Sequence, residues 1–176
     1  MPEHAESGSL AIEPDEYCFV CGPENPSGLQ ARFTAGNGQA QGTFHPRSEH
    51  QGFAGISHGG ILASLLDEAM VYAAVTLGRW VTTAELTVRY CRPARTGEPI
   101  TISAEVTRHQ RRLVECRAEL RSDAGEVVAY ATGKLMQDRE LRPEERRDRV
   151  ERVAESVGEN GDPAGQGHWV EKEACG

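Results

Sequence analysis

The chain has few aromatic residues and few apolar residues of any kind. Aromatic side chains make up 6% of its 176 residues and hydrophobic side chains 38%, with a mean hydropathy of -0.52. Aliphatic side chains and alanine must therefore supply most of the core. The length is sufficient for one domain with a buried core and too short for two.

Other absences exclude whole classes of protein. No apolar run reaches the roughly 20 residues of a membrane-spanning helix, and the N-terminal segment MPEHAESGSLAIEPDE has neither the basic nor the apolar region of a signal peptide. The 27 acidic residues outnumber the 19 basic ones, for a formal net charge of -8, which argues against a nucleic-acid-binding protein. We therefore expect a cytoplasmic protein that binds neither membrane nor nucleic acid.

The cysteines do not form a disulfide framework. Their number is odd and their spacing irregular, so we expect most of them to be free thiols: Cys18, Cys21, Cys91, Cys116 and Cys175. Cys18-x-x-Cys21 has the spacing of half a structural zinc site, but no second pair supplies the other two ligands. Cys91, His45 or His50 would have to be brought there by the fold. We therefore expect no metal, and a cysteine pair that packs the N-terminal lead-in against the sheet.

The composition divides the chain into three parts. Residues 1–15 form a polar leader, residues 16–138 carry the patterns of a folded domain, and residues 139–176 form a polar tail. Within the tail, Val150, Val153 and Val157 recur at helical spacing after Pro143, which predicts a short exposed helix over 143–157. The Gly-rich segment that follows is typical of a flexible end.

Inside the domain, one helical pattern lies between strand patterns. The segment 58–78 is apolar on nearly every side, which predicts a buried helix that ends at Gly78. Alternation of apolar and polar residues marks half-buried antiparallel strands, and the turn at 122–125 joins two of them. We expect strands over 29–35, 39–45, 83–91, 99–109, 113–121 and 126–136. The prediction is an α+β fold with an antiparallel sheet wrapped around one long helix.

Two features of this helix point to chemistry. Asp67 and Glu68 lie in the middle of the apolar segment, where an unpaired carboxylate is expensive to bury. Because neighbouring helical positions point about 100° apart, the two side chains need not share an environment. The helix opens at His58-Gly59-Gly60, where free backbone N–H groups and the helix dipole suit an anion or an oxyanion. Pairing of the carboxylates with arginines, and a glycine turn used only for packing, are the structural alternatives.

Three segments together resemble the PaaI-like family of hotdog-fold acyl-CoA thioesterases. GISHGGILASLLDEAM (55–70) is similar to the central helix of that family. The segments YCFVCG (17–22) and NPSGL (25–29) resemble the entry motif of one branch, and TAELTVRYCRPARTGEPI (83–100) resembles its strand followed by an Arg-Pro turn. The resemblance implies a hotdog fold, hydrolysis of an acyl-CoA to free acid and CoA without a separate cofactor, and a homodimer that also forms a dimer of dimers in many relatives.

The resemblance also assigns roles to residues. Its catalytic acid lies nine residues after the His of the HGG motif, which makes Asp67 the base or the nucleophile. The oxyanion donor is the N–H of Gly59, with Gly60 nearby, and His58 fixes the loop or takes part directly. Many relatives carry Asn or Gln where this chain has Gly52.

We therefore expect Gln51 to orient the water in place of the residue missing at position 52, unless the site works without it. Thr83, beside Thr82, falls where relatives place a hydroxyl that faces the acid across the interface. Four arginines near two turns are expected to bind the phosphates of CoA, because the guanidinium fork suits phosphate: Arg92, Arg108, Arg111 and Arg112.

Two other functions fit the same fold. A non-catalytic acyl-CoA sensor would not need a buried carboxylate, and neither tail contains a helix-turn-helix pattern. An enoyl-thioester hydratase or dehydratase would use a helix Asp or Glu with a nearby His on a different motif, which this sequence does not contain.

Overall fold

The computed structural model describes residues 15–140 and Cys175. Most of the predicted leader and tail, including the helix expected over 143–157, lie outside the described residues. The elements follow in this order: β1 (Arg32–Gly36), β2 (Gln39–Phe44), the 3-10 helix η1 (Ser48–His50), β3 (Gln51–Phe53), β4 (Ile56–Ser57), α1 (Gly59–Val75), β5 (Arg79–Tyr90), β6 (Ile100–Gln110), β7 (Leu113–Ser122) and β8 (Val127–Glu140).

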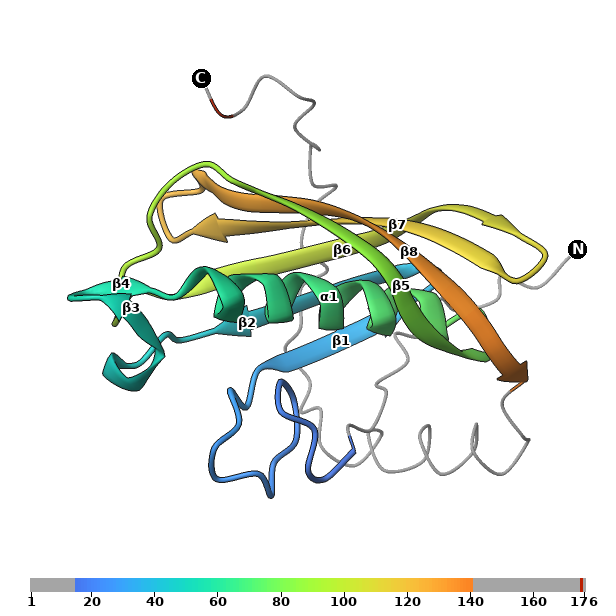
Figure 1. Ribbon diagram of the computed structural model, residues 1–176, viewed down its shortest axis with the longest axis horizontal. Coiled ribbons are helices and arrows are strands. Elements are labelled where there is room, and N and C mark those ends of the chain that lie inside the picture. Colours follow the sequence, from blue (N-terminus) through green and yellow to red (C-terminus); the bar gives the residue numbers. More distant parts are fainter. Residues whose placement is uncertain (1–14, 141–174, 176) are drawn as a thin grey trace, which may run out of the picture.

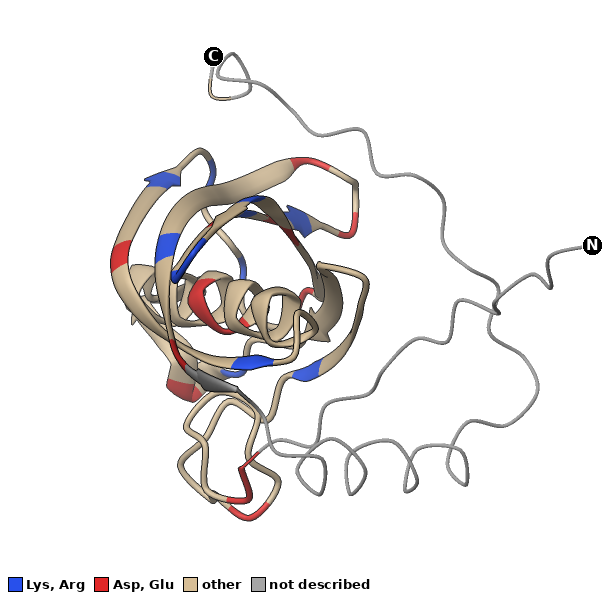
Figure 2. Ribbon diagram, turned by 90° about the vertical axis from the view of Figure 1, so that its right-hand side faces the viewer, with Lys and Arg blue, Asp and Glu red and all other residues tan. Residues whose placement is uncertain are grey.

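A single antiparallel sheet curves around the helix. Its six strands lie in the order β1-β2-β6-β7-β8-β5, and α1 crosses its concave face (Figure 1). Seen nearly along the helix axis, the sheet encloses α1 on most sides (Figure 2). The predicted α+β hotdog architecture is confirmed. Among the described strands, β1 and β5 form the two edges, and β5, with 12 residues, is the longer.

The helix is buried because apolar side chains project from nearly all of its sides. Leu65, Leu66, Ala69 and Met70 have no exposed surface. Gly133 on β8 allows the sheet to approach, since a Cβ there would lie 3.0 Å from the sulfur of Met70. The side chains of a helix that is apolar all round must be covered by protein, and here the concave face of the sheet covers them.

The predicted strands form, with shifted ends. β5 begins at Arg79 rather than at residue 83, and β8 continues to Glu140. The hairpin between β7 and β8 turns at Gly125, whose φ is +78° and whose N–H donates to Ser122 O. The small hairpin of β3 and β4 just before α1 was not predicted, because its strands have three and two residues, too few to show a period.

The cysteines fall into two groups. Cys91 and Cys175 form a disulfide, with their Cα atoms 4.8 Å apart, a pairing that the spacing in the sequence did not indicate. Cys18, Cys21 and Cys116 are free thiols, so the expectation that most cysteines are free is confirmed with that one exception. Within residues 15–140, the helical segments lack the length and apolar character of a span that crosses a bilayer.

Candidate active site

Asp67 lies in the middle of α1 and is held by a residue of the edge strand. The hydroxyl of Thr83 donates to Asp67 Oδ1 at 2.7 Å, and Asp67 is half-buried. Burial raises the pKa of this carboxyl, and the hydrogen bond from Thr83 partly opposes that shift. The β5–β8 register shifts between Thr83 and Glu85, and such bulges re-aim side chains next to functional sites. The expected hydroxyl partner is therefore Thr83, and within one chain it already contacts the acid.

Glu68, the next residue, turns to a different partner. Its Oε1 accepts from the thiol of Cys21 at 2.9 Å and from that of Cys18 at 3.6 Å. Burial raises the pKa of Glu68, and the two thiols lower it. These are the only acidic residues of α1, and they form the red band on the helix in Figure 2. The two carboxylates thus have separate surroundings, and in the described part of the chain neither is paired with an arginine.

At the N-terminus of α1, the backbone N–H groups of Gly59 and Gly60 differ in their hydrogen bonding. His58 is the N-cap, and its Nδ1 accepts the N–H of Gly60 at 2.9 Å, so in the neutral ring the proton is on Nε2. The N–H of Gly59 has no acceptor among the described residues. Of the two predicted oxyanion donors, Gly59 is therefore free and Gly60 is engaged, and His58 has the structural contact that fixes the loop.

Two residues that the sequence did not single out hold this turn. The hydroxyl of Tyr90, at the end of β5, donates to Gly59 O at 2.9 Å. The carbonyl of His50 accepts the N–H of His58 at 2.8 Å, and His50 Nδ1 accepts the N–H of Arg47. The one sequence signal for Tyr90 is its place two residues before the Arg-Pro turn, and nothing in the sequence indicates the contact that His50 makes here.

Gly59 and Asp67 are too far apart to serve one reacting carbonyl within a single chain. They are eight residues apart on the same helix, which corresponds to about 12 Å along its axis at roughly 1.5 Å per residue. Acyl transfer requires an oxyanion donor and a base that each lie about 3 Å from the reacting group. The two groups of one chain therefore do not meet at a common reacting carbonyl.

Comparisons with known proteins agree with the observed fold. Residues 54–129 match the model of the thioesterase superfamily. A solved thioesterase superfamily protein is 30% identical with a TM-score of 0.64, over 70% of this chain and 61% of that one. PaaI of Escherichia coli, from the phenylacetic acid degradation operon, is 23% identical with a TM-score of 0.61, over 64% of this chain and 83% of PaaI. The predicted resemblance to hotdog thioesterases is confirmed.

Two further relatives extend the comparison. A curated protein of Archaeoglobus fulgidus, named as an esterase, is 28% identical over 87 residues, and the match spans 49% of this chain and 56% of that relative. A hypothetical thioesterase of Streptococcus pneumoniae, solved with coenzyme A, shares the fold at 20% identity and a TM-score of 0.59, over 61% of this chain and 86% of that one.

The four arginines of this hotdog domain do not form one cluster within a chain. Arg92 donates to Val127 O at the start of β8, whereas Arg112 Nε donates to Gln137 O near its other end. Ten residues of strand separate these two carbonyls, about 33 Å at roughly 3.3 Å per residue. Arg108 and Arg111 are exposed beside Arg112, in and next to the β6–β7 turn. A single phosphate site built from all four in one protomer is therefore excluded.

Gly52 and Gln51 lie in the hairpin in front of this hotdog helix. A Cβ at position 52 would be 3.0 Å from Cδ2 of His58 and 3.2 Å from its Cα, so a side chain at this position requires His58 to move. Gln51 Oε1 accepts the N–H of Gly55 at 3.1 Å, within the same hairpin. A role for Gln51 in orienting water stays a prediction, and its observed partner is the turn.

We predict that Gly52→Asn displaces the His58 ring and breaks its hydrogen bond from Gly60. Side-chain ¹⁵N NMR at a pH where the ring is neutral should show His58 mainly protonated on Nε2 in the wild type and a mixture of tautomers in the variant. Ala54→Ser, at an exposed position in the same hairpin, is the control and should leave the His58 signals unchanged. Identical His58 spectra for Gly52→Asn and wild type would contradict the steric account.

Proposed function

We propose that the protein hydrolyses acyl-CoA thioesters at two sites, each formed by Asp67 of one subunit and Gly59 of the other. The observation that carries this proposal is the separation of eight helical residues, about 12 Å along the axis, between the half-buried, hydroxyl-bound Asp67 and the unengaged N–H of Gly59. Both groups have the form that thioester hydrolysis requires, and neither can complete a site alone. A cytoplasmic location, expected from the sequence, is part of the proposal.

The edge strand supports a two-fold arrangement that brings the halves together. Thr83 contacts Asp67 and Tyr90 contacts Gly59. The segment 83–90 of β5 therefore runs alongside the segment 59–67 of α1, with one contact at each end. A two-fold axis through the middle of 83–90 would also pass the middle of 59–67. Residue 83 of one copy would then lie opposite residue 90 of the other, and residue 59 opposite residue 67. The free edge of β5 has backbone groups that antiparallel pairing with a second copy would satisfy.

In the proposed reaction a water molecule attacks the carbonyl carbon of the thioester. Thr83 holds Oδ1 of Asp67, which leaves the other carboxylate oxygen to accept the proton of the water. The N–H of Gly59 from the partner subunit stabilises the oxyanion. When the C–S bond breaks, Asp67 returns the proton to the thiolate, and the free acid and CoA leave. Direct attack by Asp67 on the carbonyl is the alternative route.

The same axis offers a place for the phosphates of CoA. In that arrangement Arg92 of one subunit would lie level with Val81 of the partner subunit. Val81 pairs with Gln137, whose carbonyl accepts from Arg112, so Arg112 of the partner subunit approaches Arg92 at one end of the interface. Arginines that are distant within a chain would thus meet across the dimer, and the Streptococcus pneumoniae protein of the same fold was solved with coenzyme A.

Asp67→Asn should lower kcat for acyl-CoA hydrolysis by a factor of about 10²–10⁴, the usual contribution of a general base, while the dimer and its thermal stability are retained. The measurement is a coupled-thiol assay across aliphatic and aromatic acyl-CoAs, with the oligomeric state followed by sedimentation. Asp123→Asn, in the exposed β7–β8 turn, is the matched control and should keep full activity. Wild-type rates for Asp67→Asn across the panel would reject Asp67. Binding of acyl-CoA by the wild type without turnover would reject the hydrolase and favour a sensor.

Gly59→Pro should remove the oxyanion donor without disturbing the helix. Gly59 is the first residue of α1, where proline is tolerated, and His58 has φ -66° and ψ 136°, the extended conformation preferred before proline. We expect a loss of about 10²–10³ in kcat, the usual effect of deleting one oxyanion donor. Gly59→Ala keeps the N–H, with its Cβ 3.4 Å from the ring of Tyr90, and should lose far less. Equal activities of the two variants would exclude this N–H from the reaction.

A further inference from the structure

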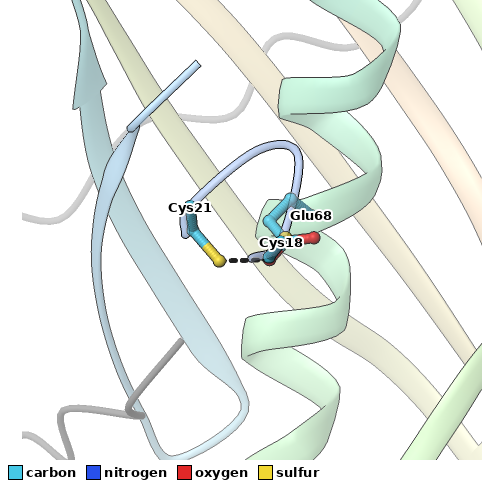
Figure 3. A group of neighbouring side chains, drawn as sticks. All are labelled: Cys18, Cys21 and Glu68. Atoms are coloured by element: carbon cyan, nitrogen blue, oxygen red, sulfur yellow. Dashed lines mark hydrogen bonds between the residues drawn. The ribbon is translucent and has the colours of Figure 1, made fainter. Parts of the chain in front are cut away.

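Two cysteines and a glutamate meet beside the helix, outside the proposed hydrolase site. Cys18 and Cys21 lie in the loop before β1, and Glu68 reaches them from α1 (Figure 3). Their sulfur and carboxylate atoms all lie within 4.8 Å of one another.

 

Cys21 is buried and Glu68 and Cys18 are half-buried, and the three residues come from two elements that only the fold brings together.

The spacing of these atoms is close to that of a zinc site. Tetrahedral zinc binds thiolate sulfur at about 2.3 Å and carboxylate oxygen at about 2.0–2.2 Å, so neighbouring ligand atoms lie roughly 3.5–3.8 Å apart. The Cys18 sulfur is 3.6 Å from Glu68 Oε1, and the Cys21 sulfur is 2.9 Å from it. An ion at the centre therefore requires a movement of less than about 1 Å from each ligand.

The loop is built to hold both sulfurs on one side. The N–H of Val20 donates to the Cys18 sulfur at 3.4 Å, and the N–H of Gly22 donates to Cys18 O at 2.9 Å. A Cβ at Gly22 would lie 2.5 Å from Cys18 N and 2.7 Å from Glu16 O, so only glycine closes this turn. An N–H aimed at sulfur stabilises a thiolate, which is the form that binds metal.

The charge of the cluster balances when an ion binds. The metal-free cluster has two neutral thiols and one carboxylate, and binding of Zn²⁺ releases the two thiol protons, so the net charge is -1 in both states. Within the described residues Glu68 has no cationic partner, and its contacts are the two thiols. Tyr72, one turn further along α1, lies beside the Cys21 side chain.

We propose that Cys18, Cys21 and Glu68 bind a zinc ion, with a water molecule as the fourth ligand, which fastens the loop before β1 to α1. Two thiolates and one carboxylate suit zinc rather than magnesium or calcium, which take oxygen ligands. This site is independent of the proposed hydrolase, since neither Asp67 nor Gly59 is a ligand.

The test measures metal in the full chain, purified without a metal-affinity step and with its thiols reduced. After incubation with zinc and gel filtration, elemental analysis should find about one zinc per chain. Replacement by cobalt should give the intense visible bands of a tetrahedral site and a sulfur-to-metal charge-transfer band. Removal of zinc by a chelator should lower the melting temperature.

The variants separate this site from adventitious binding. Cys21→Ser and Glu68→Gln should each lose the zinc and the cobalt bands. Cys116→Ser, at a buried free cysteine of the core, is the matched control and should keep both. Glu68→Gln is nearly isosteric, so it reports on the site even if Cys21→Ser does not fold. Zinc content in the wild type no higher than in Glu68→Gln, or a Cys18–Cys21 disulfide that forms in place of metal binding, would overturn the proposal.

Discussion

Burial of α1 inside the sheet is the constraint on which the other features depend. A helix covered on nearly all sides leaves its carboxylates little access to bulk water, and each unpaired charge there is costly. Asp67 and Glu68 meet this constraint in different ways, because neighbouring positions on a helix diverge by about 100°. Asp67 accepts from Thr83 on the edge strand, and Glu68 accepts from the thiols of the loop before β1. The two sides of one helix thus carry the residues of the two proposed sites.

The helical rise sets a second constraint. The backbone positions of Gly59 and Asp67 are fixed about 12 Å apart along the helix axis by the rise of roughly 1.5 Å per residue, and no side-chain movement brings an N–H at the start of a helix to its middle. The proposed chemistry therefore requires a second copy of the chain. The unpaired edge of β5 carries Thr83 and Tyr90, the contacts of both halves, so assembly and catalysis would depend on the same strand.

The sequence predicted those features that repeat along the chain or lie close together in it. Alternating residues such as Ile100 and Ile102 located the strands, and the apolar surroundings of Asp67 marked the buried helix. Contacts between distant segments left no such signal. Glu68 meets Cys21 across 47 positions and Tyr90 meets Gly59 across 31, so neither the third ligand atom beside the cysteine pair nor the tyrosine at the glycine turn was predicted. The separation of the arginines also depends on strand register, which their spacing does not reveal.

The most direct test of the shared site mixes two inactive variants. Asp67→Asn and Gly59→Pro chains are unfolded together, refolded in equal amounts, and assayed for acyl-CoA hydrolysis. If each site takes Asp67 from one subunit and Gly59 from the other, every mixed dimer regains one intact site, and the mixture should recover about one quarter of wild-type activity. If both groups act within one chain, every site keeps a defect, and a mixture as inactive as either variant alone would contradict the account.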